Sequence, residues 1–253
     1  MSVFRVFVDF STNLNRTNNK VTLGEEDSHH IKNVLRSKPG ELLEVVDTTC
    51  GEVYLSTVSS SSIPLELDLG EKLARTAKSS RIRSITVASI KGQKNDLIVE
   101  KATELDAKEI ILWNADRSVG VIKAEQIDKK HKRYLAIAES AAKQCKRNYI
   151  PEITIVSKTE DLLKHLSTIS NTEDLFLLGS TDRDAPPARN LEAPLNDVHL
   201  IIGPEGDFSA EELNKLTQFG FIPVSFAPNI LRSETAVMAA LTTVHAVWDY
   251  KKD

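Results

Sequence analysis

Short stretches of alternating hydrophobic and polar residues fill the first 70 residues of the chain. The first stretch predicts a strand, because every second side chain of a strand points to the same face. That face would hold Phe4, Val6, Val8 and Phe10. The runs 41–47 and 52–58, with a turn at 48–51 between them, predict a β-hairpin, and the run 63–69 predicts one more strand.

A short helix is expected between the first strand and the hairpin. Asp27 or Ser28 can cap its N-terminus. Its apolar residues at helical spacing are Ile31, Val34 and Leu35. Several strands and one short helix in so few residues predict a small β-barrel.

From residue 84 onward the pattern changes to apolar strands separated mostly by helices. The expected strands are 84–90, 109–113, 152–156, 174–179, 198–203 and a run ending at Phe226. The expected helices are 96–106, 124–147, 159–168, 209–219 and 233–249. This alternation predicts an α/β fold with a largely parallel sheet covered on both faces, and ligands bind such sheets beyond the carboxyl ends of the strands. The change of pattern predicts two domains, 1–73 and 74–253.

Composition narrows the class of protein. The chain has 253 residues and a formal net charge of −4, which does not suit a protein that coats nucleic acid through bulk charge. It has no apolar run of the roughly 18 residues that a bilayer requires, and its first residues do not resemble a signal peptide. Cys50 and Cys145 offer neither a disulfide framework nor a metal-ligand spacing. We expect a soluble cytoplasmic protein with no metal and no membrane partner.

Charge is distributed unevenly along the chain. Residues 73–150 carry 17 Lys or Arg against 9 Asp or Glu, whereas both flanking segments are acidic. Solvated helix faces would explain this basic block, and so would a surface that binds RNA phosphates. Lys146 and Arg147, near the end of a predicted helix, can also simply stabilise its dipole. Both interpretations stay open from charge alone.

Several common catalytic motifs are missing from the sequence. It contains no GxxxxGK[ST] phosphate loop, no GxGxxG after a strand and no GxSxG nucleophile elbow. His29 and His30 are adjacent, and adjacent helical residues point about 100° apart, so they form a poor pair of metal ligands.

The first of two informative strand ends lies at residues 199–213. A strand leads there through Gly-Pro-Glu-Gly into a helix, and Ser209 with Glu212 forms a capping box at its start. Gly203 and Gly206 allow a close backbone approach or a positive φ angle. Two glycines around a rigid Pro-Glu pair are typical of a ligand-binding loop.

The second informative strand end is the segment 225–248. Ser233 is the expected N-cap of its helix, Glu234 would lie in the first turn, where the helix dipole favours an anion, and Arg232 precedes it. From Thr235 the helix is apolar or small on nearly every side, which predicts packing in a core and against a second subunit. A buried terminal helix with no further role is the alternative.

Together these segments resemble the ribosomal RNA small subunit methyltransferase E family, the bacterial 16S rRNA uracil-N3 methyltransferases of the SPOUT class. The resemblance covers nearly the whole chain. The matching segments are HHIKNVLR (29–36), KG…EKATEL (91–105), DRSV (116–119), AKQCKRNYIP (142–151), LIIGPEGDFS (200–209) and NILRSETA (229–236). The last two, in this order before the C-terminus, form the most specific part of the resemblance.

The resemblance implies a PUA-like β-barrel that helps to seat RNA, followed by a SPOUT domain whose last strands form a trefoil knot. It implies a homodimer that uses S-adenosylmethionine (SAM) to methylate N3 of a specific uridine in 16S rRNA of the small ribosomal subunit. It assigns SAM to three loops. The implied SAM contacts are Leu178, Gly179, Ile202, Gly203, Pro204, Glu205, Gly206, Phe226, Ala227, Ile230, Leu231, Ser233, Thr235 and Ala236.

The imide N3 of uracil is protonated at neutral pH, so the reaction needs a proton acceptor or a charge that stabilises the uracil oxygens. We hypothesise that Arg232 supplies positive charge and that Glu205 or Glu234 accepts the proton, because these residues lie at the two signature loops. The candidate RNA contacts are Arg5, Arg36, Lys91, Lys94, Arg117, Lys143 and Arg147.

The sequence departs from the family at two loops. Asp207 stands where the family usually has a second Gly after GPEG, and Ala227-Pro228-Asn229 replaces a run that usually contains Gly. Two alternatives stay open, and the two departures support only the second of them. One is a SPOUT methyltransferase that acts on another RNA position, such as a ribose 2′-hydroxyl in tRNA. The other is a non-catalytic RNA-binding factor in ribosome assembly that has lost SAM.

Overall fold

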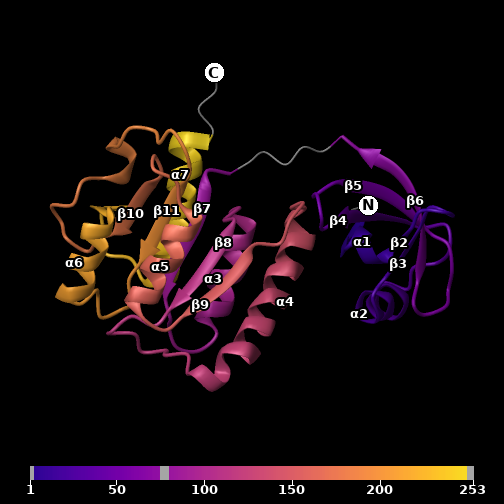
Figure 1. The fold of residues 1–253 in the computed structure, drawn as a ribbon, viewed down its shortest axis with the longest axis horizontal. Coiled ribbons are helices and arrows are strands. Elements are labelled where there is room, and N and C mark those ends of the chain that lie inside the picture. The colour runs from indigo at the N-terminus through magenta and orange to yellow at the C-terminus, as the bar shows by residue number, and fades with distance from the viewer. Residues whose placement is uncertain (1–2, 75–79, 250–253) are drawn as a thin grey trace. The chain divides into compact units, whose positions relative to one another are not determined.

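The computed structural model of the protein describes residues 3–74 and 80–249. Its contacts form two compact units, each with its own sheet (Figure 1). The first unit consists of residues 1–78 and 142–149, and the second of residues 79–141 and 150–253. The predicted domain boundary between residues 73 and 74 remains a prediction, because grouping by contacts does not test whether either part folds alone.

The first unit contains a curled six-stranded sheet. Its elements are β1 (Phe4–Val8), α1 (Phe10–Asn13), β2 (Leu14–Asn15), β3 (Lys20–Thr22), β4 (Leu42–Asp47), β5 (Val53–Val58) and β6 (Glu66–Leu73). The strand order is β1-β4-β5-β6-β3-β2, and the predicted hairpin is confirmed as the antiparallel pair β4–β5. Among the described residues the edge strands β1 and β2 do not pair with each other, so the sheet is a half-barrel rather than the closed barrel.

The short helix of this unit differs from its expected form. It begins earlier than either expected cap, as α2 (Glu25–His29), and continues as a π-helical turn (His30–Val34). Ile31 is buried in the core, but Val34 is 66% exposed and Leu35 is also exposed. The wider π turn explains the error, because residues three and four positions apart no longer share one face.

The second unit contains a parallel sheet of six strands. They are β7 (Ile82–Ala88), β8 (Glu109–Trp113), β9 (Glu152–Val156), β10 (Leu175–Gly179), β11 (Val198–Ile202) and β12 (Ile222–Val224). Their order is β12-β10-β11-β7-β8-β9, and each neighbouring pair is parallel. The predicted α/β fold with a parallel sheet is confirmed. The strand ends matter for the site, because β10, β11 and β7 are neighbours and place the loops that follow them along one edge.

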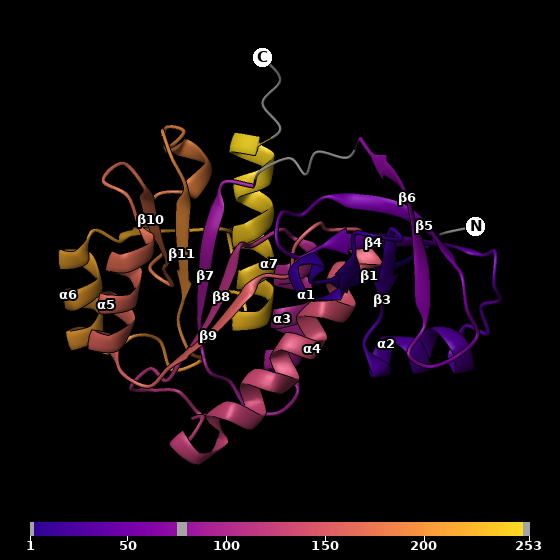
Figure 2. The same cartoon turned by 45° about the vertical axis from the view of Figure 1, so that its right-hand side comes forward.

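Helices cover both faces of this parallel sheet (Figures 1 and 2). They are α3 (Lys94–Glu104), α4 (Ile127–Cys145), α5 (Thr159–Ile169), α6 (Ala210–Phe219) and α7 (Ser233–Val244), which a π turn extends over His245–Asp249. Side chains of α3, α4 and α7 share one apolar core with the sheet, and side chains of α5 and α6 share the other. This two-faced burial explains the almost continuous apolar sequence of the central strands.

The helix α7 is amphipathic within the single chain. One face packs on α3, β7 and β11 and buries Val237, Leu241 and Val244. Thr235 and Thr242 are exposed on the other side. The expected packing in a core is confirmed for the first face, and the expected packing of the other face against a second subunit remains a prediction.

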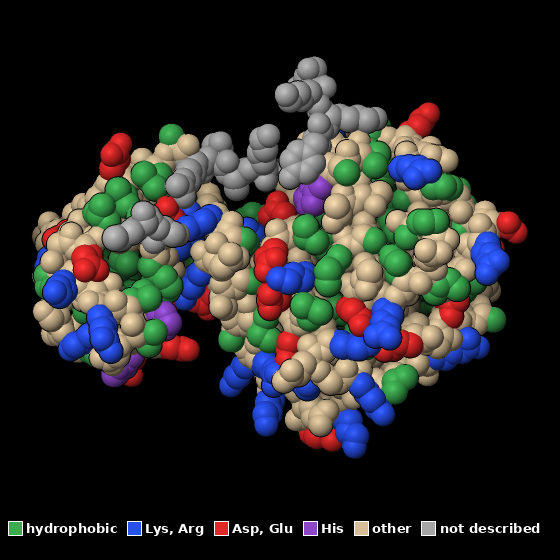
Figure 3. All heavy atoms as spheres, turned by 180° about the vertical axis from the view of Figure 1, so that it is seen from behind, with side chains coloured by type: hydrophobic (Ala, Val, Ile, Leu, Met, Phe, Trp, Pro, Cys, Tyr) green, Lys and Arg blue, Asp and Glu red, His purple; other side chains and the backbone are tan. Residues whose placement is uncertain are grey.

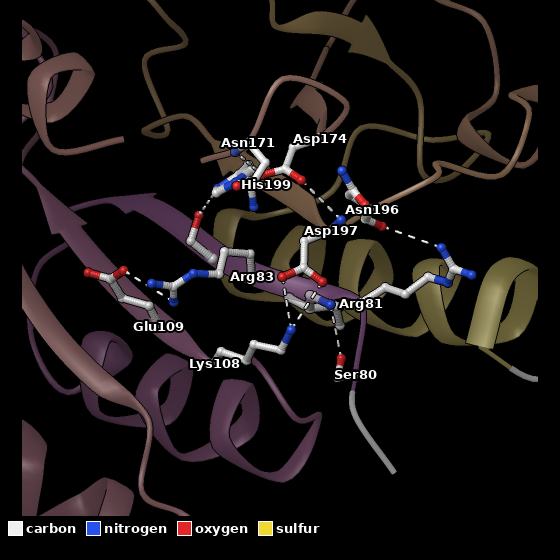
Figure 4. A network of polar contacts seen from close by, with 12 residues as sticks. Ser80, Arg81, Arg83, Lys108, Glu109, Asn171, Asp174, Asn196, Asp197 and His199 are labelled. Carbon is white, nitrogen blue, oxygen red and sulfur yellow. Dashed lines mark hydrogen bonds and ion pairs between the residues drawn. The ribbon is translucent and has the colours of Figure 1, made fainter. Parts of the chain in front are cut away.

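A polar network joins the amino-terminal part of the central strands, at the sheet end opposite the loops that follow β10, β11 and β7 (Figure 4). The imidazole of His199 lies 2.8 Å from the Ser84 hydroxyl and 3.1 Å from an Asp174 carboxylate oxygen, and it stacks on Phe176. All side-chain surface of His199 and Asp174 is buried. No substrate can reach these groups, so the network stabilises the sheet.

Candidate functional site

Three loops of the second unit surround a cavity of about 230 Å³. Two follow the carboxyl ends of β10 and β11, and the third connects β12 to α7. The residues that line the cavity are Gly179, Ser180, Thr181, Ile202, Gly203, Pro204, Glu205, Asp207, Ser225, Phe226, Ala227, Asn229, Ile230, Leu231, Arg232, Ser233 and Ala236. The strand order therefore brings together loops that are far apart in the sequence.

Eleven of the fourteen residues proposed from the sequence as cofactor contacts line this cavity. Leu178, Gly206 and Thr235 do not line it, and Leu178 is buried in the core beneath the loops. Asp207 and Asn229 also line the cavity, although neither was among the predicted contacts. The same is true of Ser180, Thr181 and Ser225. They directly follow β10 and β12, so extending each strand end by two residues would have found them.

The loop after β11 takes its shape from Asp207 rather than from its glycines. A Cβ atom on Gly203 would lie 2.9 Å from the Phe208 ring, so glycine is needed there for close packing. The residue of this loop with a positive φ angle is Asp207, at 61°, so of the two alternatives for Gly203 and Gly206 the close approach applies and the positive φ does not. Its carboxylate accepts hydrogen bonds from the Phe208 backbone N–H at 2.8 Å and from the Thr181 hydroxyl at 2.6 Å. Asp207 therefore links two of the cavity loops.

Two predicted helix caps have different outcomes. The capping box of α6 is confirmed, with Ser209 as N-cap and reciprocal hydrogen bonds to Glu212. The predicted N-cap of α7 is wrong, because Ser233 is already the first helical residue and Arg232 occupies the cap position without a side-chain cap. The Ser233 hydroxyl instead donates to the Gly203 carbonyl at 3.0 Å. That bond joins the start of α7 to the loop after β11.

A lysine lies between the two carboxylates proposed as proton acceptors. The Lys94 ammonium is 3.2 Å from the nearer Glu234 oxygen and 3.8 Å from a Glu205 oxygen. Burial alone would raise the pKa of the Glu234 carboxyl. Hydrogen bonds from its own backbone N–H and from Lys94 act in the opposite direction, as do the charges of Lys94 and Arg232. The pKa of Glu234 is therefore below its ordinary value. Glu205 and Arg232 line the cavity, whereas Glu234 lies outside it.

Two of the predicted RNA contacts, Arg5 and Arg147, are buried inside the first unit, so these two predictions are wrong. The Arg5 side chain forms an ion pair with Glu44 at 2.8 Å and donates to the backbone carbonyl of Arg147 at 2.6 Å. Arg147 is itself 7% exposed and lies over the Tyr149 ring. Neither guanidinium is free to reach a phosphate. The alternating pattern of β1 suggested that Arg5 faces solvent. Arg5 does face away from the apolar core of the unit, but it meets the buried carboxylate of Glu44 there.

The remaining candidate RNA contacts differ in their partners. Lys143 forms an ion pair with Asp27 at 2.8 Å. Arg117 is exposed but donates to carbonyls of the loop after β11, at 3.1 Å and 3.3 Å. Arg36 and Lys91 are exposed. Figure 3 shows Lys and Arg side chains along the lower edge of the larger body, mixed with acidic ones.

The described residues hold no group of three His, Cys, Asp or Glu side chains placed to bind a metal ion. None of the described helices is long and apolar enough to span a membrane. The cavity walls combine apolar side chains, carboxylates and the uncapped start of α7. Such walls suit an organic ligand that has an apolar ring, a positive charge and a carboxylate.

Comparison with known proteins yields matches over nearly the whole chain. A family model described as an RNA methyltransferase domain matches residues 78–245, and one described as an RNA methyltransferase PUA domain matches residues 23–68. A Buchnera aphidicola (subsp. Schizaphis graminum) protein named Ribosomal RNA small subunit methyltransferase E is 28% identical over 240 residues, which cover 95% of this chain and 94% of that protein.

Two solved structures are similar over the same extent. A methyltransferase structure from Legionella pneumophila with bound SAM is 26% identical, has a TM-score of 0.84 and covers 97% of this chain and 98% of that one. The structure of a Ribosomal RNA small subunit methyltransferase E from Neisseria gonorrhoeae, bound to SAM, has the same fold. Its TM-score is 0.85 at 24% identity, and the match covers 98% of each chain.

Proposed function

This chain belongs to the RNA methyltransferase family, and from that premise we propose that it transfers a methyl group from SAM to N3 of a specific uridine in 16S rRNA. One observation carries the proposal: the loop that contains Gly203 to Gly206 and the segment 229–236, which carry the most specific sequence resemblance, meet around one cavity. Residues 23–68 of the first unit match the PUA family model, which supports a role of this unit in seating the RNA.

The chemistry of the cavity walls fits SAM. Phe226, Ile230 and Leu231 offer apolar surface to an adenine ring, and Ile230 is 70% exposed in the single chain. Glu205 and Asp207 offer negative charge to a sulfonium. Arg232, the N-cap residue of α7, makes no side-chain cap bond, and the positive end of the helix dipole favours a carboxylate. Bound SAM would supply an activated methyl group on its positively charged sulfur.

Two side chains at the cavity wall have different roles in the methyl transfer: one accepts the N3 proton and the other stabilises negative charge. Glu205 is the better proton acceptor for N3, because it lines the cavity and Glu234 does not. The lowered pKa of Glu234 also makes that carboxylate a weak base. Arg232 is exposed at the cavity wall, where its positive charge can stabilise the negative charge that develops on the uracil oxygens.

We also propose a trefoil knot, a homodimer and a cytoplasmic location for the enzyme. The loop 180–197 lies next to the last strand, since Pro187 forms a parallel bridge with Ser225, and this supports a trefoil knot in which the C-terminal segment passes through that loop. The exposed face of α7 supports a homodimer. We place the enzyme in the cytoplasm, where small ribosomal subunits are assembled.

The proposal is tested by methyl transfer from labelled SAM to three substrates: small ribosomal subunits that lack the modification, protein-free 16S rRNA and tRNA. We expect label in the small subunit or its rRNA and none in tRNA. Label in tRNA alone would favour a SPOUT enzyme with another target. A protein whose melting temperature does not rise with SAM, and which transfers no label, would be a non-catalytic RNA-binding factor.

A further inference from the structure

We propose that Lys94 is a positioning residue, which anchors on Glu234 and holds the Glu205 carboxylate at the cavity wall. The proposal rests on the proposed function and deepens it. The Lys94 ammonium is within 3.2 Å of the Glu234 carboxylate and 3.8 Å of the Glu205 carboxylate. Of the three side chains, Glu234 is the least exposed at 14%, so it is the fixed end of the arrangement.

The fold brings these three residues together from distant parts of the chain. The strands β7 and β11 are parallel neighbours, so the loop that leads to Lys94 and the loop that holds Glu205 lie at the same edge of the sheet. The helix α3, which begins at Lys94, packs on α7, which begins one residue before Glu234. The start of α3 therefore meets the start of α7 and the loop after β11 at one point.

This arrangement changes the role that the sequence suggested for Lys94. An RNA contact needs a cation that is free to meet phosphate, and two carboxylates within 4 Å give this cluster a net charge of −1. Because both carboxylates already pair with the Lys94 ammonium, it has little free charge to offer a phosphate. Lys91, three residues earlier, is exposed and remains available to RNA. Two lysines of one short segment thus have different tasks.

The first test compares three variants of the full-length protein with the wild type. Lys94→Gln should lower kcat about tenfold and change KM for SAM and for RNA less than threefold, because Glu205 is misoriented while both binding surfaces persist. Lys94→Arg should restore most of kcat, because its guanidinium reaches the same carboxylates. Lys101→Gln removes a lysine that pairs with Glu100 and Glu104 on the same helix, away from the cavity, and should leave kcat unchanged.

The salt dependence of RNA binding separates positioning from RNA contact. Lys91→Gln should reduce the slope of log affinity against log salt by about one, whereas Lys94→Gln should leave the slope unchanged. A Lys94→Gln variant with a reduced slope and a normal kcat would overturn the proposal. A Lys94→Gln variant that loses activity equally with Lys101→Gln would overturn it too, since any helix-stabilising lysine would then suffice.

A measurement on the protein without SAM tests the arrangement independently of catalysis. The carboxyl titration of Glu234, followed by NMR with labelled glutamate and assigned with Glu234→Gln, should move to higher pH in Lys94→Gln and stay near wild type in Lys94→Arg and Lys101→Gln. No movement in Lys94→Gln would show that Lys94 does not hold Glu234. If the wild-type protein methylated no RNA, the proposed function would fail, and this titration would still decide the arrangement.

Discussion

The Ser233 hydroxyl donates a hydrogen bond to the Gly203 carbonyl at 3.0 Å, across 30 residues of sequence. Ser233 is buried, and this bond is made where a helix-capping bond had been expected. The N-cap position of α7 therefore has no side-chain hydrogen bond, and the loop after β11 is tied to the first turn of the helix. One hydroxyl thus connects the two segments that are most specific to the family.

We expect Ser233→Ala to weaken SAM binding about fivefold and to lower the free energy of unfolding by about 1 kcal/mol, because one buried hydrogen bond between loops is lost. Titration calorimetry with SAM and urea unfolding give the two values. Ser167→Ala is the matched control, since that hydroxyl bonds only within α5 and is exposed. Equal SAM affinity in both variants would contradict the role of this bond.

The positive φ angle of Asp207 predicts that Asp207→Asn destabilises the protein less than Asp207→Ala does. Asp207→Asn should stay within about 0.5 kcal/mol of wild type, because asparagine tolerates a positive φ angle and can keep a bond to Thr181. Asp207→Ala should lose about 2 kcal/mol, through the strained backbone and two missing hydrogen bonds. Urea unfolding followed by the fluorescence of Trp113 and Trp248, both in the second unit, measures this. An alanine variant as stable as the asparagine variant would refute the account.

The parallel sheet and its helices were predictable from the sequence, because their apolar runs are long and bounded by turns. β8 and β9 match their predicted ranges. Local patterns failed where geometry departs from a regular helix or strand, as at the π turn that exposes Val34. Most cavity residues followed from the family resemblance. The partners of Arg5, Lys94 and Ser233 did not, because these contacts join segments between 30 and 142 positions apart.

Two arginines proposed as RNA contacts should behave in opposite ways. Arg5→Ala should destabilise the first unit by about 3 kcal/mol, because it leaves the buried Glu44 carboxylate with less positive charge. Hydrogen exchange of the β1 and β4 amides measures this loss. Arg36→Ala should leave that exchange unchanged and reduce the salt slope of RNA binding by about one. An Arg5→Ala variant with wild-type exchange would contradict its structural role.

The buried His199 predicts a loss of stability in mild acid. Burial lowers the pKa of His199 below its ordinary value of 6.5, although Asp174 acts in the opposite direction and Arg83 adds to the lowering. The unfolded chain therefore binds this proton first as the pH falls. The neutral His199 side chain therefore contributes fully to the free energy of unfolding above about pH 6.5. Below that pH its contribution declines, by at most about 1.4 kcal/mol per pH unit.

Unfolding in urea at pH 7.5 and pH 5.5, read from tryptophan fluorescence, tests this dependence. His199→Gln should be about 2 kcal/mol less stable at pH 7.5, because it loses contacts with Ser84, Asp174 and Phe176. It should also lose less stability than wild type between the two pH values. His29→Gln, which changes an exposed histidine, should keep the wild-type dependence. The same dependence in His199→Gln would exclude His199 as its source.

The identity of the methylated nucleoside decides whether uracil N3 is the acceptor. The wild-type protein is incubated with SAM and small ribosomal subunits that lack the modification, and the 16S rRNA is digested and analysed by mass spectrometry. We expect 3-methyluridine at a single site, strongly reduced with Glu205→Gln and with Arg232→Ala. A 2′-O-methylated nucleoside, or no methylated product although SAM binds, would contradict the assignment of uracil N3 as the acceptor.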